Sequence, residues 1–197
     1  GRWFGMDHFG VAPDLMTFAK GLSACYLPLG AVAVNPKVAE PFETKTHFIH
    51  GFTHGGHAAA CAAGSAVIRI LHDDHLVERS AAMGQRLFSH AERLLAHPTV
   101  AAVRGWGLFM VLELVDPAGG GFFDRSRGAE RLFQRTGLGN GLVLYSSLYG
   151  PRRTARFQRG LPMWISPPFV ITETEVDDLA ERLDRTLSEW ERALGVA

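Results

Sequence analysis

The sequence predicts an α/β protein, and three observations carry that prediction. Two short apolar runs, residues 15–19 (LMTFA) and 30–34 (GAVAV), are flanked by Gly or Pro and are typical of buried strands. Residues 57–71 and 73–96 have the composition or the spacing of helices. Beyond Pro98, short strand-like segments alternate with helical ones, which is typical of an α+β unit.

Composition indicates a globular protein and excludes several functional classes. Of 197 residues, 47% are hydrophobic, and 20 basic side chains balance 20 acidic ones, which disfavours disorder and polybasic tails. The pI near 7.3 leaves no charge pattern for nucleic acid or an anionic membrane. Cys25 and Cys61 form no disulfide framework, and no apolar run or leader pattern indicates a membrane span or secretion. We therefore expect a cytoplasmic protein that binds neither nucleic acid nor membranes.

The first part of the chain is rich in loops. Gly and Pro interrupt residues 20–30 too often for a helix, and Pro36 is placed to begin a short helix that ends near Phe42. Residues 46–56 are polar and contain several histidines. The following stretch, 57–71, consists almost wholly of small and apolar residues and predicts a buried helix.

The remainder predicts a second unit. An amphipathic helix over residues 73–96 is stopped by Pro98, and Thr172 is placed to cap a final helix that begins with acidic residues. Between them we expect strands at 100–104, 108–115, 142–145 and 163–166, and a helix at 128–136. We place the domain division between residues 1–75 and 76–197.

Lys20 is the first candidate for chemistry. It is one of only three lysines, with Lys37 and Lys45, and it follows a predicted buried strand directly. A buried lysine tends to be a neutral amine, which can form a Schiff base with a carbonyl compound such as pyridoxal phosphate. Spacing alone leaves the ordinary alternative open, in which a lysine at a strand end extends into water.

Three histidines, His50, His54 and His57, lie close together and raise a second possibility, a metal-binding domain. Zinc ligands occur at such spacings, but no glutamate stands between the histidines, and no cysteine or carboxylate cluster accompanies them. We therefore expect no metal site.

Four motifs, in order along the chain, resemble class III pyridoxal-phosphate-dependent aminotransferases. The first joins residues 7–15 (DHFGVAPDL), 18–22 (FAKGL) and 26–32 (YLPLGAV), which resemble the lysine region of that family. Residues 50–62 resemble the family's His-Gly-(Tyr/Phe)-Thr stretch, and residues 103–108 and 165–173 resemble parts of its small domain. The resemblance implies the C-terminal half of a fold-type I transferase, with the end of the large-domain sheet followed by an α+β small domain.

The resemblance also implies roles for individual residues. Lys20 would carry the Schiff base of pyridoxal 5'-phosphate and move a proton during transfer of an amino group from an ω-amino acid or amine to a 2-oxo acid. Thr53 would bind the cofactor phosphate of the neighbouring subunit of a homodimer, with Gly51 and Phe52 shaping that loop. A hydroxyl and backbone amides ahead of a helix also suit an anion on physical grounds.

Substrate-binding residues are less sharply indicated. Arg152, Arg153 and Arg156 crowd one loop, where an arginine could bind a substrate carboxylate. A solvated basic loop is the alternative. Trp164 stands where some branches of the family have an arginine for that carboxylate, so this chain lacks that group, and we expect Trp164 to pack under the loop.

Three departures bear on function. The resemblance omits the family's aspartate for the pyridine nitrogen, its phosphate loop and its ring-stacking aromatic residue, all of which belong to the other half of the family's length. The alternative to an active aminotransferase is therefore a catalytically silent fragment, which would expose a sheet edge where the other half pairs. Within the matched half, Cys25 stands where glycine is common in the family.

Overall fold

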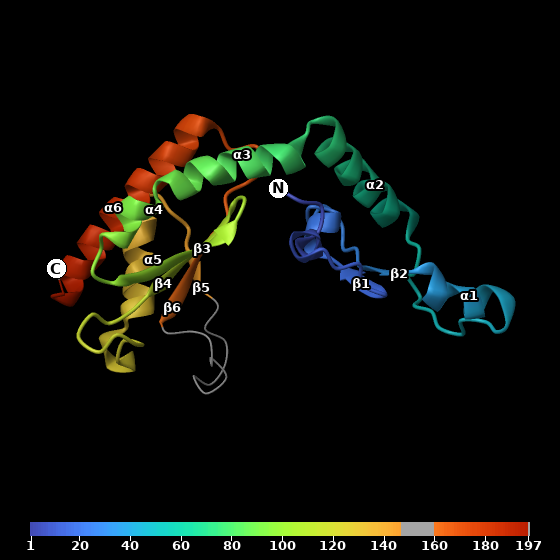
Figure 1. Cartoon of the computed structure of the whole chain (residues 1–197), viewed down its shortest axis with the longest axis horizontal. Helices are drawn as coiled ribbons and strands as arrows, with labels where there is room; N and C mark the ends of the chain where they lie inside the picture. Colours follow the sequence, from blue (N-terminus) through green and yellow to red (C-terminus); the bar gives the residue numbers. More distant parts are fainter. Residues whose placement is uncertain (147–159, 197) are drawn as a thin grey trace. The chain divides into compact units, whose positions relative to one another are not determined.

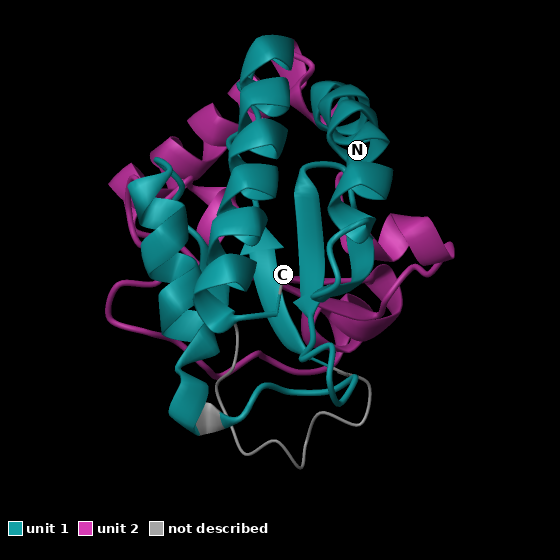
Figure 2. Ribbon diagram, turned by 90° about the vertical axis from the view of Figure 1, so that its left-hand side faces the viewer, with its two compact units in different colours: residues 1, 78–197 teal, residues 2–77 magenta. Residues whose placement is uncertain are grey.

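The computed structural model describes residues 1–146 and 160–196. These residues form two compact units, which Figure 2 colours magenta and teal. The N-terminal unit comprises Arg2–Val77, and the C-terminal unit comprises Glu78–Ala197 together with Gly1.

The N-terminal unit is built around a two-stranded antiparallel ribbon. Strand β1 (Leu15–Phe18) pairs with β2 (Ala31–Val34), and a 3-10 turn, η1 (Gly5–Phe9), precedes them. The two predicted strands therefore exist. Their predicted burial is wrong, because every residue of β2 is exposed and β1 alternates between exposed and half-buried positions.

Two helices follow the ribbon. Helix α1 (Pro36–Thr44) begins at the predicted proline, where the Asn35 side chain accepts a hydrogen bond from the amide of Val38 at 3.0 Å. Helix α2 (Ala58–Asp73) also forms where predicted, but only Ala60 and Gly64 of it are buried. The expectation of a buried helix is wrong because nothing within residues 2–77 covers most of its surface.

The C-terminal unit has one antiparallel sheet of strand order β3-β4-β6-β5. Its helices lie along one side of the sheet (Figure 1). The strands are β3 (Val100–Trp106), β4 (Phe109–Leu114), β5 (Tyr145–Ser146) and β6 (Leu161–Ile165). The helical elements are α3 (Leu76–Ser89), α4 (Ala91–Leu95), η3 (Arg125–Arg127), α5 (Ala129–Gly139) and α6 (Glu173–Leu194).

Alternate strand residues and the helix faces above them form one apolar core. Because successive strand side chains point to opposite faces, β4 and β6 each send every second residue into this core. The strand contributions are Met110, Leu112, Leu114, Leu161, Met163 and Ile165, all buried. Trp190 of α6 is fully buried between Phe123 and Phe133, and its Nε1 donates to the carbonyl of Ala129 at 2.9 Å.

Helix α6 begins and ends as its sequence predicts. The Thr172 hydroxyl accepts from the Glu175 amide, and the Glu175 carboxylate accepts from the Thr172 amide, which together form a capping box. The hydrogen bonds that the Glu175 carboxylate accepts from the amide and the hydroxyl of Thr172 lower the pKa of Glu175. Gly195 ends the helix in the left-handed conformation at φ 66°.

Two boundaries differ from expectation. The predicted helix over residues 73–96 is two helices, α3 and α4, interrupted at His90, and Asp74 closes α2 instead of opening the next helix. The predicted strand at 142–145 is displaced to Tyr145–Ser146. Leu142 and Leu144 are nevertheless buried. Their apolar spacing thus predicted burial correctly, although they do not pair in the sheet.

Charged side chains connect α3 to α6. Arg86 donates to both carboxylate oxygens of Asp177, at 2.9 and 2.6 Å, and to Glu173 at 2.8 Å. His90 contacts the same Asp177 at 3.1 Å. The hydrogen bonds from Arg86, and secondarily from His90, lower the pKa of Asp177 to about 2.

This carboxylate makes the C-terminal unit sensitive to acid. The pKa of Asp177 in the folded state lies below its ordinary value of 3.8. Its contribution to the free energy of unfolding is therefore complete above the unfolded pKa, and it is lost as the pH falls toward about 2. Asp177→Asn should flatten the loss of stability between about pH 5 and pH 2, measured by urea unfolding with circular dichroism. Asp178→Asn, which removes only the exposed pair with Arg182, is the control. An unchanged acid limb in Asp177→Asn would contradict this assignment.

Among residues 1–146 and 160–196, no helix combines the length and the apolar character needed to cross a membrane.

Candidate functional site

Lys20 lies in a tight turn at the end of β1. Ala19 continues the extended backbone, and Lys20 then adopts a left-handed conformation at φ 49° as the first residue of η2 (Lys20–Leu22). Left-handed backbone is uncommon for a residue with a Cβ atom and is typical of turns under tight constraint. The Lys20 side chain is exposed in this structure, as in the alternative of a strand-end lysine that extends into water.

The same turn contains two more left-handed residues. Ala24 and Cys25 have φ values of 46° and 62°. The buried Ser23 stabilises the turn, since its hydroxyl donates to the carbonyl of Leu27 at 2.7 Å. Glycine adopts positive φ without a steric penalty, which gives a physical reason why it is common at the position of Cys25 in the family that the sequence resembles. We call residues 19–27 the lysine turn.

Helix α2 packs closely against this part of the chain through Gly64. A Cβ atom at Gly64 would lie 2.6 Å from Cδ2 of Leu29 and 3.4 Å from the carbonyl oxygen of Leu22. A residue larger than glycine would therefore require the Leu29 side chain to move, while its Cβ would touch the Leu22 carbonyl of the lysine turn. The contact explains why Gly64 is one of the few buried residues of the unit.

The predicted phosphate-binding residues Gly51, Phe52 and Thr53 are exposed and precede α2. The amide of Gly55 donates to the carbonyl of Phe52 at 2.9 Å, so Thr53 occupies a turn. Thr53 does not cap the helix. His57 does, because its Nδ1 accepts from the amide of Ala60 at 3.3 Å.

A row of rings supports this segment, and the sequence analysis missed it. Ring centroids are 5.5 Å apart between Phe42 and Phe48, 5.8 Å between Phe48 and His50, and 4.9 Å between His50 and Phe52. The row connects α1 to the Thr53 turn by edge-on contacts. The spacing of Phe48, His50 and Phe52, two residues apart, is a signal that could have indicated rings on one side of an extended segment.

The three neighbouring histidines have other contacts. His50 belongs to the ring row, His57 caps α2, and His54 lies with its ring 6.4 Å from that of His57. In the part of the chain that the structure describes, no group of three or more His, Cys, Asp or Glu side chains is arranged to hold a metal ion.

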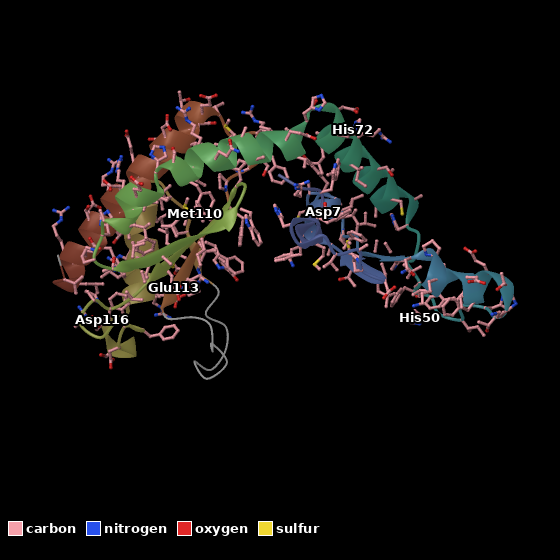
Figure 3. All side chains as sticks on the ribbon, viewed as in Figure 1. Asp7, His50, His72, Met110, Glu113 and Asp116 are labelled. Atoms are coloured by element: carbon pink, nitrogen blue, oxygen red, sulfur yellow. The ribbon has the colours of Figure 1, made fainter. Side chains whose placement is uncertain are left out.

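The two predicted parts of the cofactor site lie in one unit but not side by side. In Figure 1 the segment before α2 runs beside α1, whereas β1 lies toward the other end of the unit. Figure 3 shows the same separation for two labelled side chains, His50 next to Gly51 and Asp7 near β1. The segment before α2 and the strand β1 are thus displayed on different parts of the N-terminal unit.

Trp164 belongs to the C-terminal unit. It is half-buried on β6, and its neighbours Met163 and Ile165 point into the core, so its ring lies on the opposite face of the sheet. Phe109 and Tyr145 flank it, each with a ring centroid 5.5 Å away. Arg152, Arg153 and Arg156 lie outside the described residues.

Comparison with known proteins agrees with this arrangement. Residues 1–187 match the family model of class-III aminotransferases. The putrescine–pyruvate aminotransferase of Pseudomonas aeruginosa is 34% identical over 91% of this chain and 37% of its own length. The diaminobutyrate–2-oxoglutarate transaminase of Halomonas elongata is 34% identical over 98% of this chain and 40% of its own. A crystal structure of an (S)-enantioselective omega-transaminase from Thermomicrobium roseum superposes with a TM-score of 0.82 at 33% identity, over 96% of this chain and 40% of that one.

The fold is that of the C-terminal part of a fold-type I transferase. The chain belongs to the class-III aminotransferase family. It spans about two fifths of the length of these relatives.

The lysine turn predicts a stabilising substitution. A left-handed backbone conformation costs a residue with a Cβ atom about 1–2 kcal/mol, and glycine avoids this cost. Glycine in turn loses roughly 0.5–1 kcal/mol on folding, because its unfolded chain has more conformational entropy. Cys25→Gly should therefore stabilise the turn by up to about 1 kcal/mol and slow hydrogen exchange of its amides, measured by mass spectrometry. Cys61→Gly, inside α2, is the control and should speed exchange in that helix. Faster exchange of the lysine turn in Cys25→Gly would contradict the explanation.

Proposed function

We propose that the protein containing these residues transfers an amino group from an ω-amino acid or amine to a 2-oxo acid, with pyridoxal 5'-phosphate attached to Lys20. Membership of the class-III family and the names of its relatives support amino transfer. The observation that carries the assignment is the position of Lys20, in a constrained left-handed turn at the end of β1, inside the family match.

The side chains present fit the two reactive ends of this cofactor. Lys20 offers an exposed primary amine for the aldehyde, and Thr53 offers an exposed hydroxyl in a turn ahead of α2 for the phosphate dianion. When bound, pyridoxal phosphate withdraws electrons from the amine carbon of the substrate and so permits loss of a proton there.

Lys20 would have a second task. As a free amine, its Nζ could take the proton from the substrate carbon and return it at another carbon. The left-handed turn holds the lysine backbone in one conformation. This limits the positions from which Nζ approaches the reacting carbon.

Thr53 would act on the neighbouring subunit of a homodimer. The segment before α2 runs beside α1, whereas β1 lies toward the other end of the unit, and this separation supports a site that takes one segment from each of two copies. The ring row from Phe42 to Phe52 would fix the backbone of Gly51 and the hydroxyl of Thr53 toward the phosphate.

Substrate selection would involve the C-terminal unit. We assign Trp164, together with Phe109 and Tyr145, to an apolar wall for the carbon skeleton of the amine. Arg152, Arg153 and Arg156 would supply cations for a substrate carboxylate.

A second candidate is that these 197 residues are catalytically silent by themselves. Two observations favour it: Lys20 is exposed, and the chain covers about two fifths of its relatives. The two candidates differ in whether the isolated chain binds the cofactor at Lys20, which a labelling experiment decides.

Incubation with pyridoxal phosphate followed by borohydride reduction should label Lys20 selectively if the first candidate holds for the isolated chain. Peptide mass spectrometry locates the modified residue. Lys20→Ala should abolish the label, whereas Lys37→Ala and Lys45→Ala are matched controls that should retain it. Label scattered over all three lysines would support the silent fragment and would show that the isolated chain does not bind the cofactor selectively at Lys20.

Thr53 has its own test. A hydrogen bond to a charged group contributes about 1.5–3 kcal/mol, so Thr53→Val should weaken retention of pyridoxal phosphate by roughly 10–100-fold. Cofactor release is measured from the absorbance of the dialysed protein. Thr53→Ser keeps the hydroxyl and should remain within a few-fold of the parent. Equal retention in Thr53→Val and the parent would exclude Thr53 from the phosphate site.

A further inference from the structure

Asn140, at the end of α5, stands in a sequence that favours spontaneous loss of its side-chain amide. It is followed by Gly141. A glycine has no side chain to shield its backbone nitrogen, so that nitrogen can attack the side-chain carbonyl of the preceding asparagine. The chain's other asparagine, Asn35, is followed by Pro36, which has no N–H and cannot react in this way. Asn140 is therefore the asparagine at which the chain can modify itself.

This reaction exchanges one bond of the side chain for another. The backbone nitrogen of Gly141 forms a bond to Cγ of Asn140, and the bond from Cγ to the side-chain nitrogen breaks. That nitrogen takes up the proton that Gly141 gives up and leaves as ammonia. Water then opens the cyclic imide at either of its two carbonyls, which leaves aspartate or isoaspartate at position 140. Water is the co-reactant, and nothing is oxidised or reduced.

The folded chain holds the attacking nitrogen in a hydrogen bond. The amide of Gly141 donates to the carbonyl of Leu138 at 3.0 Å. The amide of Leu142 donates to the carbonyl of Gly137 at 2.8 Å, so α5 ends in a Schellman motif. Gly141 has the left-handed conformation that this motif requires, at φ 77°. The nitrogen can therefore reach the side chain of Asn140 when this end of the helix opens.

The amide of Asn140 joins α5 to α6. Its nitrogen donates to Oε2 of Glu189 at 2.8 Å and to the hydroxyl of Thr186 at 3.2 Å, both on α6. It also donates to the carbonyl of Thr136 in its own helix at 3.3 Å. Arg182 of α6 donates to the backbone carbonyl of Asn140 at 3.0 Å. The leaving group of the reaction is thus the same nitrogen that connects the two helices.

We propose that Asn140 is a self-modification site, which loses its amide by cyclisation with Gly141 when the end of α5 opens and then weakens the contact of α5 with α6. A carboxylate at position 140 has no N–H to donate, and it would lie beside the like charge of Glu189. Arg182, a cation beside this position, is already paired with Asp178 at 2.7 Å. The inference rests on these hydrogen bonds and does not depend on the proposed amino transfer.

The first measurement is the rate at which Asn140 loses its amide in the 197-residue chain. The chain is incubated in mildly alkaline buffer with and without urea, and peptide mass spectrometry with electron-transfer fragmentation identifies aspartate and isoaspartate. We expect the unfolded chain to react at least about tenfold faster, because folding adds several hydrogen bonds that must break. Asn35 is the internal control and should keep its amide. Equal rates with and without urea, or equal reaction at Asn35, would overturn the proposal.

The second measurement tests the consequence for the two helices. Asn140→Asp should lower the melting temperature by about 3–6 °C, measured by circular dichroism. In a Glu189→Gln background the same change should cost less, because the amide at position 189 can donate to the new carboxylate. Gln85→Glu, the same chemical change at an exposed position of α3, is the matched control and should have little effect.

Two outcomes of this second measurement would contradict the proposal. If Asn140→Asp melts with the parent, Arg182 compensates the new charge and the modification has no effect on the helices. If Asn140→Asp costs the same in both backgrounds, Glu189 is not the cause of the loss. Where Asn140→Asp alone does not fold, recovery of a folded chain in the Glu189→Gln background supports the proposal, and failure to recover it counts against it.

Discussion

The apolar stripe of α6 is the constraint on which the C-terminal unit depends. Trp190 fills the centre of the core between two phenylalanine rings, and its Nε1 needs the carbonyl of Ala129, so α5 and α6 are fixed in one arrangement. One residue further, the buried Glu191 accepts from the hydroxyl of Thr99 at 2.6 Å and contacts His97 at 2.8 Å. A buried carboxylate tolerates few positions, because its lone pairs need partners. These contacts hold the start of β3, and with it the sheet, against the helix.

The N-terminal unit has no comparable constraint. Its ribbon is short, and its helices expose most of their apolar residues. Gly64 of α2 approaches Leu22 and Leu29. The chain therefore divides into a unit that encloses its own core and a unit whose large apolar residues are largely exposed. This difference lies in packing and not in secondary structure, since helices and strands form in both units.

The sequence predicted the elements well and their surroundings poorly. Thr172 and Pro36 marked helix starts correctly, because capping is a local interaction that the neighbouring residues determine. Apolar periodicity identified β1, β2 and α2 but placed them in a core. Periodicity shows which side chains favour burial, whereas the surface that buries them can belong to another polypeptide. Ordered motifs singled out Lys20 and Thr53 as candidate site residues, and these roles stay predictions. The left-handed backbone of Lys20 was not predicted, because no residue type in the turn requires it.

The left-handed backbone of Lys20 raises the question of what stabilises the lysine turn. Lys20, Ala24 and Cys25 all occupy an unfavourable conformation within six residues, and none of them is glycine. Local preference therefore opposes the lysine turn, and contacts from outside it must hold it. Within the described residues, the Ser23 hydrogen bond to Leu27 lies inside the turn, whereas the contact of Gly64 in α2 with Leu22 comes from outside it. The packing of α2 therefore helps to hold the turn that contains Lys20.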